Sequence, residues 1–185
     1  MSSRVEGASL FRQLIGPGFE ALDARLRAIH SATTSRAYAG SCSVERGSGL
    51  FSKVCGALAR LPPPSERIPL RVIISPEARG ETWRRSFGGV PMRSRLHARD
   101  GVLEERFGPS VVCFRLEARD GVIHWHPAGM RTLGVPWPDG FLHGSGAREW
   151  VEDGRYRFEV AVHLRGAGLL VRYVGTLDVD PHDAP

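Results

Sequence analysis

Lysine, glutamine and asparagine are almost missing from this sequence: Lys53 is the single lysine, Gln13 is the single glutamine, and asparagine does not occur. Arginine, alanine, glycine and proline are abundant instead, as in proteins from GC-rich genomes. A formal net charge of +5 could indicate a nucleic-acid partner. However, the arginines alternate with acidic residues and form no single run. We therefore expect a solvated basic surface and no nucleic-acid partner.

Cysteine is also scarce, since Cys42, Cys55 and Cys113 are the only three. Their odd number and wide spacing, without a C-x-x-C pair, exclude a zinc finger and a disulfide-rich secreted scaffold. No segment reaches the roughly 18 apolar residues of a membrane span, and the N-terminus lacks the apolar stretch of a signal peptide. These absences predict a cytoplasmic, bacterial protein with no membrane partner.

What is present is an ordinary globular composition, with 185 residues, 42% of them hydrophobic and 24% charged. This length and balance predict one domain over residues 1–185, with a helical part at 8–62, antiparallel strands at 68–180 and a disordered tail at 181–185.

Helical spacing of apolar residues marks the N-terminal part. Ser9 is placed to cap a short helix, and Pro17 begins a longer one that ends near His30, where the helix dipole favours a histidine. A short β-segment is expected at Arg36–Arg46. A further short helix is expected within residues 50–61, before a run of prolines.

From Ile68 onward, apolar residues recur with period two, which is typical of strands. The Asp-Gly pairs at 100–101, 120–121 and 153–154 suit two-residue hairpin turns and so predict antiparallel neighbours. Residues 134–146, rich in glycine and proline, are expected to be a loop without regular pairing. The alternating segments are 70–74, 83–87, 92–96, 103–107, 112–118, 122–125, 156–164 and 169–179.

These patterns predict an α+β fold, mainly antiparallel β, in which about eight strands form a curved sheet or barrel with two or three N-terminal helices. Because the C-terminus lacks a long helix, the helix-grip fold is disfavoured.

Two charged residues fall on apolar strand faces. If Trp83 and Phe87 point inward, Arg85 must do so too, and the same alternation turns Glu105 inward. Buried charges are normally paired. Arg85 and Glu105 should therefore bind each other, bind a ligand, or border a wet cavity, unless a bulge turns one of them outward.

Other reactive side chains give weaker patterns. Tyr156 and Tyr173 lie on the apolar phase of their strands, and each hydroxyl needs a partner if it is buried. His124 and His126 share a strand face, but no third ligand is evident, so we expect no metal. The sequence has no G-x-S-x-G, no phosphate loop and no dinucleotide-binding glycine motif, so we also expect no cofactor.

Several short motifs resemble a bacterial family known as domain of unknown function 4166. They are LFRQLIG at 10–16, WRRSFG at 83–88, ERFGP at 105–109, GVPWP at 134–138 and GLLVRYVG at 168–175. In that family the domain occurs alone or appended to dehydrogenase-like domains. The resemblance implies a stand-alone form here, with an accessory role and a dehydrogenase-like partner protein. It implies no catalytic residues.

Two functions fit these observations. The first is binding of a small hydrophobic or amphipathic molecule inside the barrel, with Arg85, Glu105, Trp83, Tyr156 and Tyr173 as ligand-binding residues. The second is a cofactor-independent cyclase, isomerase or lyase that uses the same pocket, with Glu105 as general acid or base and Arg85 steadying an anion. A protein–protein module with a filled interior is a third possibility.

Overall fold

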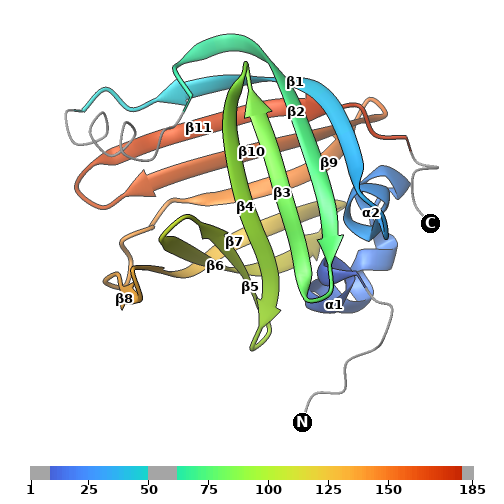
Figure 1. Ribbon diagram of the computed structural model, residues 1–185, viewed down its shortest axis with the longest axis horizontal. Coiled ribbons are helices and arrows are strands. Elements are labelled where there is room, and N and C mark those ends of the chain that lie inside the picture. The colour runs from blue at the N-terminus through green and yellow to red at the C-terminus, as the bar shows by residue number, and fades with distance from the viewer. Residues whose placement is uncertain (1–8, 50–61, 181–185) are drawn as a thin grey trace.

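A computed structural model of the chain describes residues 9–49 and 62–180 (Figure 1). Its short helices are α1 (Leu10–Ile15), the 3-10 helix η1 (Gly16–Ala21) and α2 (Ala24–Ser31). The strands are β1 (Arg36–Arg46), β2 (Ser65–Glu77), β3 (Gly80–Phe87), β4 (Val90–Arg99), β5 (Val102–Phe107), β6 (Ser110–Arg119), β7 (Val122–Thr132), β8 (Val135–Pro136), β9 (Gly146–Glu152), β10 (Arg155–Leu164) and β11 (Gly168–Leu177).

The strands close into an antiparallel barrel. Ten of them form a ring in the order β1-β2-β3-β4-β5-β6-β7-β9-β10-β11, which the β1–β11 pairing completes, and β8 pairs on the outside of β7. The predicted antiparallel barrel is therefore confirmed, but it has ten strands rather than about eight. The prediction missed β9 because Glu149 occupies the middle inward position of that strand.

The N-terminal segment differs in part from the prediction. Ser9 caps α1 as expected, since its hydroxyl accepts a hydrogen bond from the backbone N–H of Arg12. The expected long helix is instead two pieces, η1 and α2, because the backbone is extended at Leu22 and Asp23 then caps a new helix. The helix expected within residues 50–61 and the tail at 181–185 lie outside the described residues.

The two ends of the barrel have different turns. The three Asp-Gly turns adopt the predicted left-handed conformation. They lie at the end covered by the helices, where Gly154 approaches Arg25 of α2. The opposite end, called the far end below, carries the turns at 88–89, 108–109, 133–134 and 165–167, with β8 beside them (Figure 1). There the loop prediction for 134–146 needs correction, since Val135 and Pro136 pair with Thr132 and Arg131.

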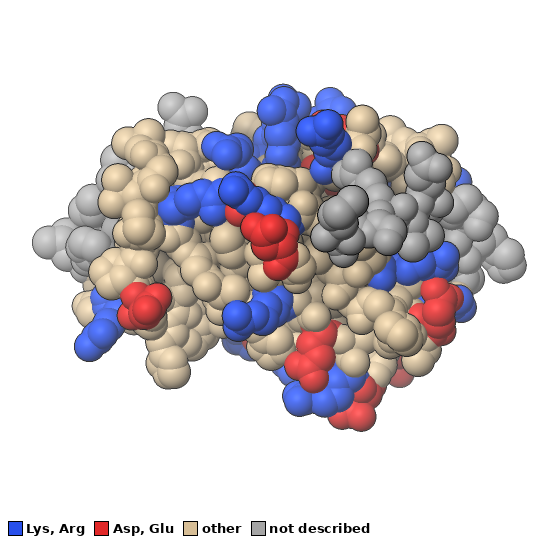
Figure 2. Space-filling model, turned by 90° about the horizontal axis from the view of Figure 1, so that it is seen from below, with Lys and Arg blue, Asp and Glu red and all other residues tan. Residues whose placement is uncertain are grey.

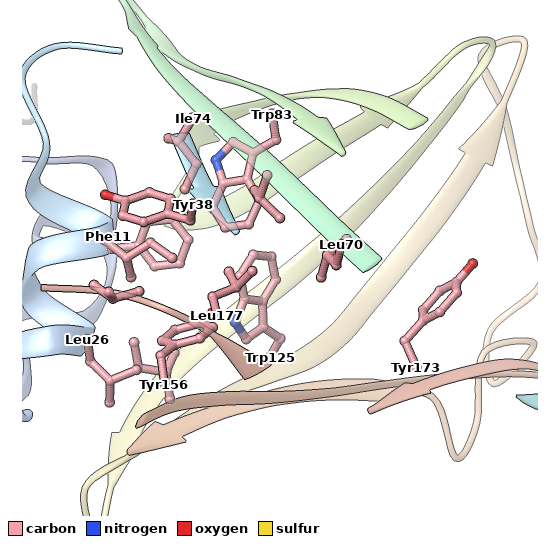
Figure 3. Packing of buried hydrophobic residues seen from close by; sticks show 14 of the residues in the cluster. Phe11, Leu26, Tyr38, Leu70, Ile74, Trp83, Trp125, Tyr156, Tyr173 and Leu177 are labelled. Atoms are coloured by element: carbon pink, nitrogen blue, oxygen red, sulfur yellow. The ribbon is translucent and has the colours of Figure 1, made fainter. Parts of the chain in front are cut away.

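The interior follows the predicted alternation. Inward residues such as Leu70, Ile74, Trp83 and Leu177 form one core with Phe11, which the helices insert into the barrel (Figure 3). At Gly40 a β-carbon would lie 1.9 Å from the carbonyl oxygen of Thr176. Glycine at this position therefore permits the close β1–β11 approach that closes the ring.

Arginine occupies many outward-facing strand positions, as the sequence predicted. In a view from below, basic side chains lie in groups, several of them next to acidic side chains (Figure 2). Among the described residues, no helix is long and apolar enough to cross a membrane.

Candidate functional site: the barrel interior

All five predicted ligand-binding residues point into the barrel. Trp83 and Arg85 come from β3, Glu105 from β5, Tyr156 from β10 and Tyr173 from β11. Their positions follow from strand alternation, because each shares its face with buried apolar neighbours. The fold thus brings the five side chains to one interior.

Arg85 and Glu105 contact each other. Nη2 of Arg85 lies 3.1 Å from Oε1 of Glu105, and Ser94 donates a hydrogen bond of 2.7 Å to the same oxygen. Arg85 also donates to the Ser94 hydroxyl and stacks over the Trp83 ring at 4.7 Å. The side chains of Arg85 and Glu105 are only 15% and 6% exposed. The pair is therefore nearly neutral and well satisfied, which makes Glu105 a poor general acid or base.

Tyr173 has a different environment. Its ring stacks on Phe87 with centroids 5.0 Å apart, and its buried hydroxyl has no hydrogen-bond partner among the described residues. Burial raises the pKa of this hydroxyl, although the nearby Arg46 and Arg85 guanidiniums oppose the shift. Figure 3 shows the hydroxyl pointing away from the helices. A buried hydroxyl without a protein partner is able to donate a hydrogen bond to a bound molecule.

The barrel is packed most tightly at the helical end. Phe11, Leu96 and Ile123, at the helical end, are at most 1% exposed. Side chains around Tyr173 and toward the far end also pack against the core but remain partly exposed. These are Met92, Phe114, Val160 and Val162. The interior of the far half is therefore apolar, with Phe87 and Val171 buried and these four side chains partly exposed.

A separate hollow of about 420 Å³ lies against β1, β2 and β3. Its lining includes Tyr38, Leu70 and Arg71 but none of the five predicted ligand-binding residues.

The structure adds a second polar cluster inside the barrel, under the helices, that the sequence analysis missed. Nε2 of His30 lies 2.5 Å from Oε2 of Glu149, and Tyr156 forms a hydrogen bond with the same carboxylate. The His30 ring stacks on the Phe11 ring, with centroids 3.7 Å apart. His30 lies in the last turn of α2 as predicted, but its side chain is 0% exposed and binds this carboxylate, which the sequence analysis did not foresee.

Glu81 is a further buried carboxyl near this cluster. It accepts a hydrogen bond of 2.8 Å from the Trp83 indole N–H. Burial raises the pKa of Glu81, and Glu149 raises it further, while the Trp83 hydrogen bond and His30 lower it. Burial likewise raises the pKa of Tyr156 well above its ordinary value. The alternation that placed Arg85 inward also applies to Glu81, so the sequence did contain a signal for this carboxyl.

An outer-face cluster was also not predicted. Oε2 of Glu104 accepts from Arg131 at 2.7 Å and lies 3.0 Å from His97 Nε2, while Cys113 lies beside the carboxylate. The Arg131 hydrogen bond lowers the pKa of Glu104. This cluster joins four neighbouring strands, so we read it as a structural brace.

The two histidines considered as metal ligands lie on β7. His124 and His126 stack with centroids 5.8 Å apart, and His126 contacts Glu117 at 3.1 Å. Within residues 9–49 and 62–180, no group of three or more histidine, cysteine, aspartate or glutamate side chains could hold a metal ion.

The family model described as Domain of unknown function (DUF4166) matches residues 22–177. No curated protein matches the chain.

Proposed function

The chain belongs to this family of domains of unknown function, and we propose that it binds a small amphipathic molecule inside the barrel. The apolar part of the ligand would lie among the partly exposed side chains of the far half. Its polar group would accept a hydrogen bond from the Tyr173 hydroxyl.

The observation that carries this proposal is the unpartnered hydroxyl of Tyr173 beside water-accessible apolar side chains. Leaving a buried donor without a partner costs about 1–3 kcal/mol, and a ligand with an acceptor would recover that energy. Trp125 repeats the pattern, because its buried indole N–H also has no partner among the described residues.

The five residues would have different roles. Tyr173 would contact the ligand's polar group, and the Arg85–Glu105 pair would form a polar wall without a net charge. Trp83 and Tyr156 belong to the tightly packed half, with exposures of 5% and 2%, so they would close the bottom of the site. Arg46 also lies near the Tyr173 hydroxyl, which favours an anionic polar group, such as a carboxylate.

The test is a titration with a fluorescent fatty acid, 11-(dansylamino)undecanoic acid. We expect saturable binding of one molecule per chain. Val160 neighbours Tyr173 across β10 and β11, so Val160→Trp should fill the site and abolish binding. The next residue along the strand points outward, and Ala161→Trp is the matched control that should bind normally. Weak, non-saturable binding, or equal binding by both variants, would refute the proposal.

The buried His30–Glu149–Tyr156 cluster favours a second candidate, a cofactor-independent cyclase, isomerase or lyase. An imidazole with one nitrogen on a carboxylate and its other nitrogen without a partner among the described residues is a common arrangement for proton transfer. This candidate moves the acid–base role from Glu105 to His30. Mass spectrometry of a molecule co-purified with the protein would test it: turnover requires that the molecule differ between the native protein and Glu149→Gln.

A further inference from the structure

One hairpin tip exposes hydrophobic side chains to solvent. Leu133, in the turn between β7 and β8, is 81% exposed, and Val135 is 66% exposed. Among the described residues, these are the large hydrophobic side chains that are strongly exposed. They lie in one short hairpin at the far end (Figure 1).

Leu133 also adopts a backbone conformation that its residue type disfavours. Its φ is +52°, in the left-handed region. The other described non-glycine residues with positive φ are Asp100, Asp120 and Asp153, each followed by glycine in a hairpin turn. Aspartate tolerates this conformation better than leucine does. The one turn of this set without aspartate thus places a leucine at a strained turn position and exposes its apolar side chain to solvent.

The far end has no acidic residue in its described turns, which are Gly88-Gly89, Gly108-Pro109, Leu133-Gly134 and Arg165-Gly166-Ala167. At the helical end, by contrast, Asp100 and Asp120 each lie beside an arginine that offsets their charge. Asp139, in the longer loop that follows β8, is an acidic residue nearby.

A row of arginines lies on the outer face of the barrel and ends at the base of this hairpin. Arg95, Arg106 and Arg131 lie in one register row on the outer faces of β4, β5 and β7, and Arg131 pairs with Pro136 of β8. Arg131 binds Glu104. Arg95 and Arg106 face each other with no ion-pair partner among the described residues, an arrangement that is unfavourable without an external anion. The exposed apolar tip therefore has a basic flank.

We propose that the far end docks on an anionic lipid bilayer, with Leu133 and Val135 entering the headgroup region and the arginines contacting lipid phosphates. Leucine beside basic residues is the combination that binds membrane interfaces, whereas leucine and valine are under-represented among the dominant residues of protein interfaces. Surface docking needs no spanning segment, so this proposal revises the expectation of no membrane partner. It does not depend on a ligand inside the barrel.

Cosedimentation with vesicles tests the proposal. We expect binding to vesicles of 70% phosphatidylcholine and 30% phosphatidylserine at 50 mM salt, and much weaker binding to pure phosphatidylcholine or at 500 mM salt. Leu133→Asn should weaken binding about tenfold, because the variant lacks the leucine side chain that the bilayer would bury. Its thermal stability should be unchanged or higher, since asparagine suits positive φ. Arg106→Gln should also weaken binding to the anionic vesicles.

The controls identify the alternatives. The matched control is Asp120→Asn, which changes a turn at the helical end of the barrel and should bind vesicles normally. A substitution such as Leu10→Asn at that end is unsuitable, because it would disturb the core. Failure to bind anionic vesicles, or equal binding by Leu133→Asn and the native chain, overturns the proposal. Tight binding to poly-glutamate without vesicle binding would also overturn it and would identify an acidic protein as the partner.

Discussion

Replacing Glu105 by alanine would test whether the barrel encloses its ion pair. The substitution removes the acceptor of two hydrogen bonds, from Arg85 and from Ser94, and leaves the guanidinium without a counter-charge. Breaking a buried ion pair typically costs about 3–5 kcal/mol. Because the Arg85 side chain is 15% exposed and retains its contact with Trp83, we expect a loss of about 3 kcal/mol, at the low end of this range.

The assay is urea denaturation, with the midpoint and the m-value measured for each variant. Asp178→Ala is the matched control, because it breaks the Arg155–Asp178 pair, whose side chains are 57% and 66% exposed. That variant should lose less than about 1 kcal/mol. A double variant, Arg85→Leu with Glu105→Leu, should recover at least half of the loss, since no unpaired charge remains.

The reasoning fails if Glu105→Ala is no more destabilising than Asp178→Ala. That result would mean that water solvates Arg85 fully and that this part of the interior is an aqueous cavity.

Three further outcomes follow from the structure. The pKa of Glu81 is raised in the folded state. Its contribution to stability is therefore present below the ordinary glutamate pKa of about 4.5 and is lost as pH rises through the raised pKa. In unfolding experiments across pH 4–8, Glu81→Gln should gain stability relative to the native chain as pH increases. Burial raises the pKa of the Cys42 thiol to about 11, so peptide mapping after iodoacetamide treatment should find it labelled far more slowly than the partly exposed Cys113. Gly40→Ala should cost at least about 2 kcal/mol because its β-carbon would overlap the Thr176 carbonyl, whereas Gly49→Ala, which meets no atom closer than 3.9 Å, should stay within about 0.5 kcal/mol of the native stability.

Period-two alternation was sufficient to predict most of the barrel. It placed Trp83, Arg85 and Phe87 on the inner face and, by the same reasoning, brought Glu105 to Arg85. The Asp-Gly turns then established the antiparallel order. Local patterns could do this because side-chain direction in a strand depends only on the position along that strand.

The rest depended on contacts distant in sequence. The partner of His30 is Glu149, 119 residues away. No local sequence pattern predicts a contact between the end of α2 and β9, because β9 lacks the apolar alternation that marks the other strands. The number of strands was underestimated for the same reason, because β9 carries Glu149 in its centre. The break before α2 was missed because the apolar spacing continues through Leu22 while the backbone does not.

The central claim, that Tyr173 offers a hydrogen bond to a ligand, is tested most directly by removing its hydroxyl. Tyr173→Phe and Tyr156→Phe should be compared for urea stability and for affinity toward 11-(dansylamino)undecanoic acid. We expect Tyr173→Phe to be at least as stable as the native chain and to lose about tenfold in affinity, because its hydroxyl has no described protein partner. Tyr156→Phe should lose about 1 kcal/mol of stability, because its hydroxyl binds Glu149. Unchanged affinity in Tyr173→Phe, or a stability loss equal to that of Tyr156→Phe, would contradict the account.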